Sequence, residues 1–176
     1  MDKLSELVAR QEIQDVLGRY ARSVDRRDWE SLRECFHDDA HDQHGEFTGS
    51  VDAFIDWVST RHASVPFSMH FLGNCLIEFL GPEAAWVETY FIAMQRRDEP
   101  PAKLSVSTGA VDMEVFARYC DRFELRAGVW RIAFRRVVYD STRTLPSSHD
   151  LRELVGVLGR RDRGDPVFLV KKQAAE

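Results

Sequence analysis

The sequence predicts an α+β domain in which N-terminal helices pack on one face of a curved β-sheet. Apolar residues first recur at helical spacing, and long segments rich in Val, Ile, Phe, Tyr and Trp then follow one another directly. Helices that precede a run of strands favour a segregated α+β arrangement over an alternating α/β one. With 176 residues, 44% of them apolar and 11% aromatic, the chain is long enough for one domain with a sizeable core.

Helices are expected at three places before the long strands. Apolar residues at helical spacing predict a helix over 3–24, with Gln11 as a position where it could break. Asp28 is a typical N-cap and begins a second, short helix. The third helix is expected over 51–61. The apolar face of the second helix consists of Trp29, Leu32, Cys35 and Phe36, and that of the third of Phe54, Ile55, Trp57 and Val58.

The remaining regular elements are expected to be strands. Residues 39–49 contain Gly45 and Gly49 and indicate a short β-hairpin. Enrichment in β-branched and aromatic residues, with turn residues in between, predicts longer strands in the rest of the domain. These strands are expected over 67–80, 84–97, 104–125 and 129–140.

The last part of the chain, 141–176, differs from the rest. It contains Pro146 and Pro166 and a charged stretch over 160–165, and a short helix is expected over 150–158. We therefore expect a domain over 1–140 that is followed by a tail. The tail either forms a lid, packs on a partner subunit or stays mobile, and the sequence leaves these alternatives open.

Charge and cysteine content limit the partners and the compartment. The net charge of −5 disfavours nucleic acid, because a phosphate-binding domain usually carries a basic excess. The chain begins without the apolar run of a signal peptide and lacks the roughly 20 apolar residues that a membrane span needs. Three cysteines without a CxxC pair indicate reduced thiols. We expect a soluble, cytoplasmic protein that binds neither nucleic acid nor membranes.

The most informative side chains are those of Tyr20, Asp25 and His70. A carboxylate that holds an imidazole fixes its tautomer and stabilises its charged form, which gives a general base. A phenol nearby can donate a proton. Taken alone, these residue types favour a structural interpretation, in which Asp25 ends a helix and His70 belongs to the core.

Several short phrases of the sequence, in the expected order of elements, carry a resemblance to a known family. They are Ile13-Gln14-Asp15, Tyr20 with Asp25 and Trp29, His70, and the run from Tyr119 to Glu124 that leads to Trp130-Arg131-Ile132. Over residues 5 to about 140 the chain resembles the SnoaL-like branch of the nuclear transport factor 2-like superfamily. The resemblance implies a cone made by a curved, mixed sheet around helices, with a pocket at the open end, and a homodimer or homotrimer.

The resemblance also implies roles for individual residues. Members of the branch that eliminate water or HCl use an Asp–His pair, and the matching positions here are Asp25 and His70. Tyr20 matches a tyrosine that bile-acid dehydratases carry five residues before the aspartate. Two positions depart from that enzyme, because Ala93 stands where it has a further carboxylate and Tyr139 lies near its late arginine. These departures argue against bile acids as the substrate.

Arg135 and Arg136 are neighbours on the last predicted strand, so only one of them can point inward. Arg136 lies four residues after the apolar Ile132, so regular alternation along the strand places both on the inward face, although a bulge would reverse this. The family pattern instead favours Arg135, which would then bind a substrate carboxylate or polarise a carbonyl. An exposed cross-strand pair with Glu114 or Asp121 explains the same residues equally well.

The run from His37 to His44 has the composition of a metal site but not the geometry. In a strand, His41 and Gln43 face opposite to Asp42 and His44, so the ligands do not converge on one point. We therefore expect no metal. Asp42 or His44 faces the pocket instead, and Asp42 is a candidate substrate contact.

Aromatic residues on the predicted sheet include Trp86 and Tyr90. They serve either as plain core or as the wall of a cavity for an apolar ligand, steroid-like or aromatic, and we expect both to contact the substrate. Asn74 either orients the substrate or satisfies backbone groups in a bulge near Gly73.

These observations predict a cofactor-independent lyase or isomerase that removes a carbon-bound proton from a hydrophobic small molecule, with dehydration as the leading reaction. The sequence has no Gly-rich phosphate loop and no nucleophile elbow, and no cofactor is expected. Epoxide hydrolysis on this fold needs an Asp–Arg–Asp arrangement, which the sequence does not place. The alternative is a non-catalytic role, as the β subunit of a ring-hydroxylating dioxygenase or as a ligand-binding module.

Overall fold

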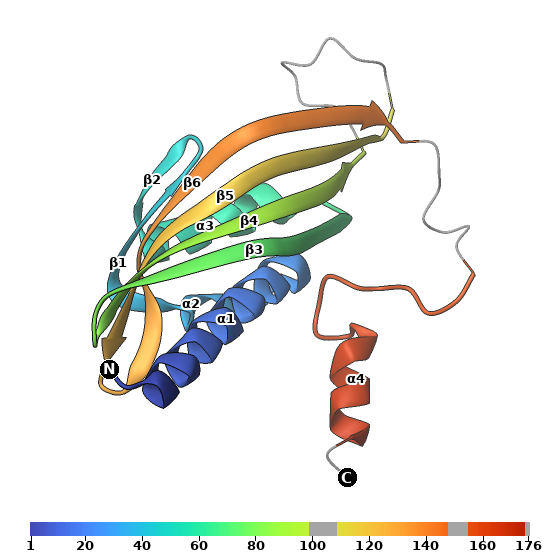
Figure 1. The fold of residues 1–176 in the computed structure, drawn as a ribbon. Coiled ribbons are helices and arrows are strands. Elements are labelled where there is room, and N and C mark those ends of the chain that lie inside the picture. Colours follow the sequence, from blue (N-terminus) through green and yellow to red (C-terminus); the bar gives the residue numbers. More distant parts are fainter. Residues whose placement is uncertain (99–108, 148–154, 175–176) are drawn as a thin grey trace.

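A computed structural model describes residues 1–98, 109–147 and 155–174 of the chain. Within these residues, helices pack against a six-stranded sheet that curves without closing, and a helix near the C-terminus projects from the body (Figure 1). The predicted α+β fold class is therefore confirmed. The helices are α1 (Lys3–Arg26), α2 (Trp29–Arg33), α3 (Val51–His62) and α4 (Pro166–Gln173).

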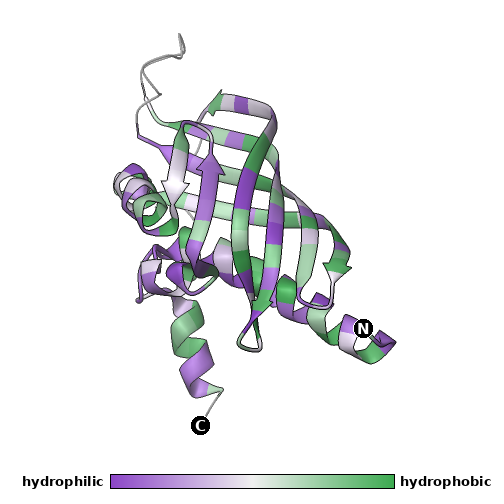
Figure 2. Cartoon of the chain, turned by 90° about the vertical axis from the view of Figure 1, so that its left-hand side faces the viewer, coloured by the Kyte–Doolittle hydropathy of each residue, from purple (hydrophilic) through white to green (hydrophobic). Residues whose placement is uncertain are grey.

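The sheet is mixed and has the strand order β2-β1-β6-β5-β4-β3. Strands β1 and β6 run parallel, and the other described pairs are antiparallel. Alternating side chains give the strands the green and purple bands of Figure 2. The long strands agree with the predicted ranges to within a few residues, except that 104–108 lie outside the described residues and β6 continues past 140. The strands are β1 (Phe36–His44), β2 (Phe47–Ser50), β3 (Phe67–Gly81), β4 (Ala84–Arg97), β5 (Val111–Arg126) and β6 (Val129–Pro146).

Helix α1 provides the apolar surface on which the sheet packs. It begins at a cap in which the Asp2 carboxylate accepts hydrogen bonds from the backbone N–H groups of Leu4 and Ser5. The predicted break near Gln11 is wrong, because the helix is continuous and the exposed Gln11 amide donates to Asp15 one turn later, at 2.7 Å. The buried face of the helix includes Ala9, Ile13, Val16, Leu17, Tyr20, Ala21 and Val24.

The predicted hairpin forms, but its first strand begins earlier than expected. Phe36 is fully buried and pairs with Ile132 of β6, so β1 joins the main sheet as well as β2. The sequence does not reveal this parallel pairing, because the partner strand lies far along the chain. The turn between β1 and β2 uses Gly45 at a φ of 64°, a conformation that glycine adopts without steric cost.

The C-terminal tail differs from its prediction. The expected helix over 150–158 falls mostly outside the described residues, and 155–158 are not helical. Helix α4 lies further on and is capped by Asp165, whose side chain accepts a hydrogen bond from the backbone N–H of Val167. No residue of α4 is buried. In the part of the chain that the structure describes, every helix is too short or too polar to cross a membrane.

Candidate active site

Asp25 and His70 form a direct and largely buried pair. Oδ1 of Asp25 lies 2.7 Å from Nδ1 of His70, and the two side chains are 5% and 8% exposed. Oδ2 of Asp25 accepts a hydrogen bond of 2.9 Å from the backbone N–H of His70. The Ser68 hydroxyl donates to Oδ1 at 3.2 Å. Because a carboxylate only accepts, Nδ1 of His70 carries the hydrogen, and Nε2 is left as the basic nitrogen.

The local fold explains why these side chains meet. Helix α1 packs against β3, and Asp25 lies at the C-terminal end of the helix, beside the start of that strand. Ser68 and His70 are two residues apart on β3, so they share one face of the strand. Both therefore reach the same carboxylate, and the pair is built from elements that the core holds rigidly.

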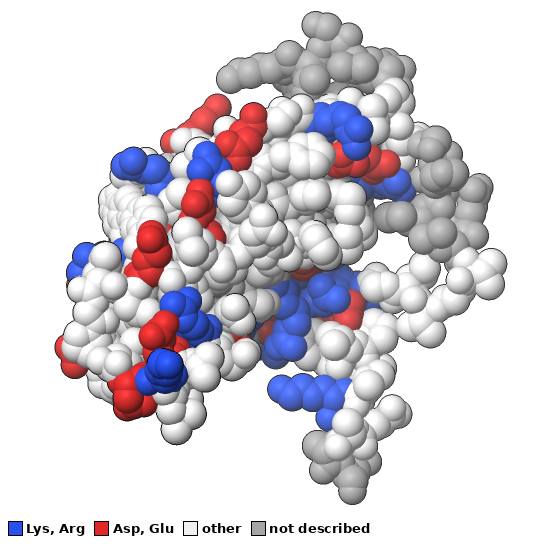
Figure 3. All heavy atoms as spheres, viewed as in Figure 1, with Lys and Arg blue, Asp and Glu red and all other residues white. Residues whose placement is uncertain are grey.

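A segment of the tail closes the end of α1. The Arg161 guanidinium donates to the backbone carbonyl oxygens of Val24 and Asp25, at 3.0 and 2.9 Å, and to that of Val65 at 2.7 Å. It thereby adds a donor to carbonyl groups at and near the end of α1, of which those of Val24 and Val65 also accept from Arg27. Burial and the neighbouring Arg27 lower the pKa of Arg161 to about 10. Figure 3 shows positively charged side chains gathered where this segment meets the body.

Tyr20, His44 and His70 line a small cavity between the helices and the sheet. Aromatic side chains that include Trp57 and Tyr139 complete its wall. The cavity volume is about 70 Å³, whereas pockets for drug-sized ligands measure about 300–1,000 Å³. As it stands, the cavity is therefore too small for a whole polycyclic compound.

Tyr20 is held between the cavity and a buried cation. The guanidinium carbon of Arg135 lies 4.0 Å from the centre of the Tyr20 ring and 3.9 Å from that of the Tyr119 ring. Contacts of this kind are cation–π interactions, which are strongest where water is excluded. Burial raises the pKa of Tyr20 above its ordinary value. The phenol therefore keeps its hydrogen at neutral pH and serves as a hydrogen-bond donor.

Arg135, and not Arg136, points into the core. The pairing of β6 with β5 shifts by one residue at Ala133, and this bulge reverses the parity that runs from Ile132. The orientation expected from parity is therefore wrong, and the one expected from the family pattern is confirmed. Arg136 lies at the surface and donates to the Gln43 side chain at 2.7 Å.

The buried Arg135 pairs with Asp121, while its Nη1 atom has no hydrogen-bond partner among the described residues. Its Nε and Nη2 atoms donate to the two oxygens of the Asp121 carboxylate, at 2.8 and 2.6 Å, and both side chains are 0% exposed. The alternative of an exposed cross-strand pair with Glu114 or Asp121 is wrong for Arg135, because its pair with Asp121 is buried. Arg135 does not line the cavity. Arg135 lies beneath the Tyr20 ring and supports it. It therefore has no direct contact with a molecule bound in the cavity, although a substrate contact was expected.

Asp42 and His44 face inward from β1, as their common parity predicts. Asp42 is fully buried, and neither of its carboxylate oxygens has a hydrogen-bond partner among the described residues. Burial raises the pKa of Asp42 to about 7. Burial lowers the pKa of His44, which lines the cavity, to about 3. Asp42 thus reaches the cavity only through His44, and its predicted substrate contact is not a direct one.

No cluster of three or more His, Cys, Asp or Glu side chains that could hold a metal ion occurs among the described residues.

Asn74, Trp86 and Tyr90 lie on the outer face of the sheet, away from the Asp–His pair. They do not line the cavity beside that pair. Alternation along β4 buries Phe91 on the inner side and turns Trp86 and Tyr90 outward, where they are 38% and 47% exposed. Asn74 lies where the pairing of β3 with β4 shifts, so the bulge expected near Gly73 is confirmed.

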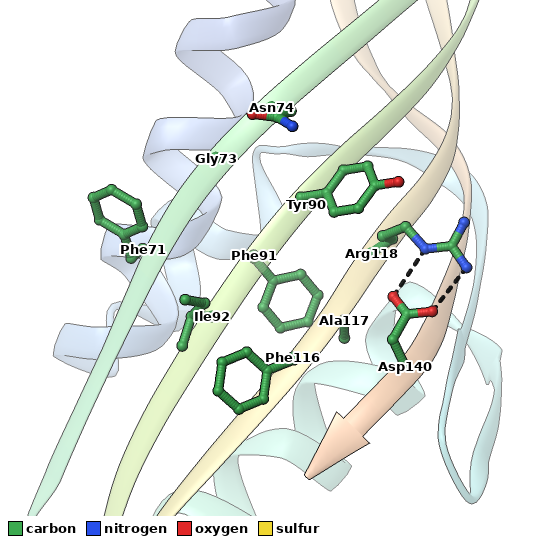
Figure 4. A pocket seen from close by; sticks show the side chains of 10 residues that line it. All are labelled: Phe71, Gly73, Asn74, Tyr90, Phe91, Ile92, Phe116, Ala117, Arg118 and Asp140. Atoms are coloured by element: carbon green, nitrogen blue, oxygen red, sulfur yellow. Dashed lines mark hydrogen bonds and ion pairs between the residues drawn. The ribbon is translucent and has the colours of Figure 1, made fainter. Parts of the chain in front are cut away.

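A larger hollow is on this outer face (Figure 4). It measures about 640 Å³ and is lined by apolar side chains that include Phe71, Tyr90 and Phe116. The charged side chains that line it are Arg118 and Asp140, which neutralise each other in an ion pair of 2.9 Å. Most of this face is uncharged in Figure 3. The larger hollow therefore has no unpaired acid or base among the residues that line it.

Sequence reasoning missed three contributors to the site, namely Ser68, Tyr119 and Arg161. Ser68 lies two residues before His70 on a predicted strand, and this spacing is a signal that could have placed both on one face. Tyr119 lies on β5 in the quoted family phrase, but its contact with Arg135 depends on a bulge. Arg161 had no local signal, because its partners are the backbone groups of a distant helix end.

Comparisons with known proteins agree with this architecture. The family model of the SnoaL-like domain matches residues 5–136. A hexachlorocyclohexane dehydrochlorinase, LinA type 2, superposes with a TM-score of 0.73 at 20% identity, over 85% of this chain and 97% of that one. A scytalone dehydratase-like protein from Novosphingobium aromaticivorans gives 0.70 at 18% identity, over 85% and 99%. A protein of unknown function from Mycobacterium tuberculosis gives 0.63 at 21% identity, over 99% and 92%. No curated protein sequence matches the chain.

Proposed function

The chain belongs to the SnoaL-like domain family, and we propose from this premise that it is a cofactor-independent lyase or isomerase, with dehydration as its reaction. The observation that carries the proposal is the 2.7 Å contact between Asp25 and His70 at the wall of a cavity. An imidazole held in this way is a general base whose tautomer and orientation are fixed before the substrate arrives.

In the proposed reaction, Nε2 of His70 removes a proton from a carbon atom beside an electron-withdrawing group. The Asp25 carboxylate stabilises the imidazolium that forms, because it lies within 2.7 Å of Nδ1. Base catalysis by a positioned group typically contributes about 10²–10⁴-fold. Tyr20 lines the same cavity and donates a hydrogen bond to the developing enolate or to the leaving oxygen.

The substrate is proposed to be a hydrophobic small molecule, steroid-like or aromatic, that carries a carbonyl and a hydroxyl group. Aromatic residues of the wall, among them Trp57 and Phe91, suit an apolar body. The volume of about 70 Å³ fits the reacting carbon atoms, so a larger molecule needs the wall to yield at Trp57 or Tyr139. The subunits are proposed to assemble as homodimers or homotrimers in the cytoplasm.

The test is turnover by the purified protein against hydroxylated steroids and aromatic polyketide-like ketones, followed by mass spectrometry for loss of one water. His70→Gln is expected to reduce the rate about 10²–10⁴-fold, because the basic nitrogen is lost. The matched control is His41→Gln, an exposed histidine of β1 that faces away from the cavity and stacks on Phe134. Equal turnover in both variants would refute the assignment of the base.

The second candidate is a non-catalytic role, as the β subunit of a ring-hydroxylating dioxygenase or as a ligand-binding module. The observation in its favour is the apolar outer face of the sheet, where Phe71 is 64% exposed and Tyr90 47%. Purification distinguishes the two. A protein that is stable alone as a small homo-oligomer favours the enzyme, and one that is insoluble without an iron–sulfur partner subunit favours the scaffold.

Epoxide hydrolysis is less well supported, although Arg135 pairs with Asp121 and also acts electrostatically on Asp42. All three side chains are 0% exposed, and none of them lines the cavity where an epoxide would bind. Activation of a water molecule on an epoxide needs direct contact, which these residues do not offer.

A further inference from the structure

A second Asp–His pair lies beside the same cavity as the first. Oδ1 of Asp42 is 3.7 Å from Nδ1 of His44, and both residues belong to β1. His44 lines the cavity together with His70. We propose that Asp42 and His44 form a proton relay that delivers a proton to the departing hydroxyl group while His70 removes one from carbon. This inference rests on the proposed elimination and adds the source of the second proton.

Charge balance indicates that Asp42 holds a proton. Arg135 is the buried cation of this region, and Asp121 already matches its charge through two hydrogen bonds. Asp42 is therefore a surplus carboxyl group, 0% exposed, and neither of its oxygens has a hydrogen-bond partner among the described residues. A buried carboxylate without a partner is costly, and such a group neutralises itself by binding a proton.

His44 has the position of a transfer group. Its Nδ1 is buried and lacks a hydrogen-bond partner among the described residues, whereas the side chain as a whole is 19% exposed at the cavity. We therefore assign Nε2 to the edge of the ring that faces the cavity. Stacking on Phe54, with ring centres 5.4 Å apart, fixes the plane of the ring. The gap of 3.7 Å exceeds a hydrogen bond, and such contacts in empty sites often tighten only when substrate is bound.

The charged and titratable groups around the relay agree with a neutral His44 beside a protonated Asp42. Burial and nearby positive groups keep the pKa of His44 low, and burial with Asp121 nearby raises that of Asp42. The groups that face the two residues come from every packed element, namely Tyr20 of α1, Arg61 of α3, His70 of β3, Asp121 of β5, and Arg135 and Tyr139 of β6.

The proton transfers balance. Nε2 of His70 takes the proton from carbon, the C–H electrons form the new C=C bond, and the C–O bond breaks. The leaving oxygen takes the hydrogen of Nε2 of His44 and departs as water, while Nδ1 of His44 takes the carboxyl proton of Asp42. His70 ends as imidazolium and Asp42 as carboxylate. His70 then loses its proton to solvent, and Asp42 takes one up, which restores both groups. Tyr20, whose phenol keeps its hydrogen, contributes a hydrogen bond and not the transferred proton.

The first test separates acid from base catalysis by means of the leaving group. The probes are a β-hydroxy ketone that the wild-type protein dehydrates and the β-chloro ketone of the same skeleton. Chloride leaves without a proton. Asp42→Asn and His44→Gln are therefore expected to slow loss of water about 10²-fold or more and loss of chloride less than about threefold. His70→Gln is expected to slow both. The controls are Asp39→Asn and His41→Gln, which are exposed on the same strand.

A merely structural role of Asp42 would lower both reactions equally, and that result overturns the relay. So does unchanged loss of water in Asp42→Asn. Melting curves of each variant show whether it is folded before its rates are compared.

The second test needs no substrate and decides the matter where turnover is absent. In protein labelled at aspartate carboxyl carbons and histidine nitrogens, NMR is expected to show Asp42 titrating near neutral pH and His44 neutral above pH 5, with the His44 signals following the Asp42 titration. An Asp42 carboxyl that titrates below about pH 5 overturns the relay. An inactive protein that passes this test has the protonated Asp42 beside a neutral His44 and refutes the proposed elimination instead.

Discussion

The two Asp–His pairs of this protein contain the same residue types but differ in how they are held. Asp25 meets His70 from a different element, at 2.7 Å, and its carboxylate also accepts from Ser68 and from a backbone N–H group. Asp42 and His44 come from one strand, are 3.7 Å apart, and carry buried atoms without hydrogen-bond partners among the described residues. The hydrogen bonds of the first pair are formed before substrate binds, whereas those of the second are not.

This difference indicates what each pair can do. A carboxylate with three donors is stabilised in its charged form, which is what the partner of a base requires. A carboxyl group that is buried without donors is stabilised in its neutral form, which is what a proton source requires. The predictions below test the contrast, from the largest expected effect to the smallest.

Asp25→Asn is expected to have the largest effect, because it converts the complete pair into an incomplete one. The amide no longer stabilises an imidazolium at His70 and can hold the wrong tautomer. We expect kcat to fall about 10²–10⁴-fold. Steady-state kinetics on any substrate that the wild-type protein converts measures this change. Full activity in a folded Asp25→Asn protein would mean that the tight pair is structural only.

Asp42→Asn is expected to change how stability depends on pH. The folded-state pKa of about 7 lies above the ordinary value of 3.8. Between these values the native protein binds more protons than the unfolded chain, so this group makes the free energy of unfolding fall as pH rises from about 4 to 7. The variant lacks this dependence.

Asp42→Asn should therefore gain stability relative to the wild-type protein as pH rises, by on the order of 1.4 kcal/mol for each unit of pKa difference. Urea unfolding at pH 5 and pH 8 measures the change, and Asp39→Asn serves as the exposed control. His44 is present in both proteins, so its opposite pH dependence cancels in the comparison. A variant that loses relative stability at pH 8 would show instead that Asp42 is ionised and paired.

The sequence predicted the tight pair better than the loose one, for physical reasons. Asp25 ends a long amphipathic helix and His70 begins a strand, and the family resemblance joined the two. Alternation along a short strand also predicted correctly that Asp42 and His44 point inward. The sequence could not show that Asp42 is a surplus carboxyl group. That conclusion depends on Arg135 pointing inward and pairing with Asp121.

The direction of Arg135 depends on a bulge at Ala133, and a bulge of one residue leaves no clear mark in the pattern of apolar residues. The face of Trp86 and Tyr90 could not be predicted for the same reason. Their aromatic character suits either face of the sheet, and only the register of β4 decides that they face outward. Element types follow from local patterns, whereas the face that a strand presents depends on its partners.

Arg161→Met is expected to weaken the support of the tight pair without removing it. The substitution deletes hydrogen bonds to the carbonyl oxygens of Asp25 and Val65 and the contact of 2.8 Å with Nδ1 of His62. Buried acceptors that lose a charged donor cost about 1–3 kcal/mol of stability. Chemical unfolding measures this loss, and kcat should fall by less than about tenfold, because the Asp25 side-chain contacts remain.

The matched control for that variant is Arg160→Met. The Arg160 side chain is 61% exposed and pairs with Asp162 at the surface, so its loss is expected to change stability by less than about 0.5 kcal/mol. Equal effects of the two substitutions would mean that the tail does not support the end of α1. Burial and Arg161 hold the pKa of His62 at about 2 in the folded protein. NMR should show this pKa rising in Arg161→Met and unchanged in Arg160→Met.

Gly45→Ala is expected to have the smallest effect and acts on the hairpin that carries the loose pair. Gly45 has a φ of 64°, and a Cβ atom there would lie 3.3 Å from the Tyr139 hydroxyl oxygen. The left-handed conformation costs a non-glycine residue about 1–2 kcal/mol. Gly81→Ala is the control, because a Cβ atom at Gly81 meets no atom within 4 Å. Thermal unfolding compares the two. A Gly45 variant as stable as the control would show that the turn is free to change shape. The 3.7 Å gap between Asp42 and His44 would then be set by the cavity wall and not by the hairpin.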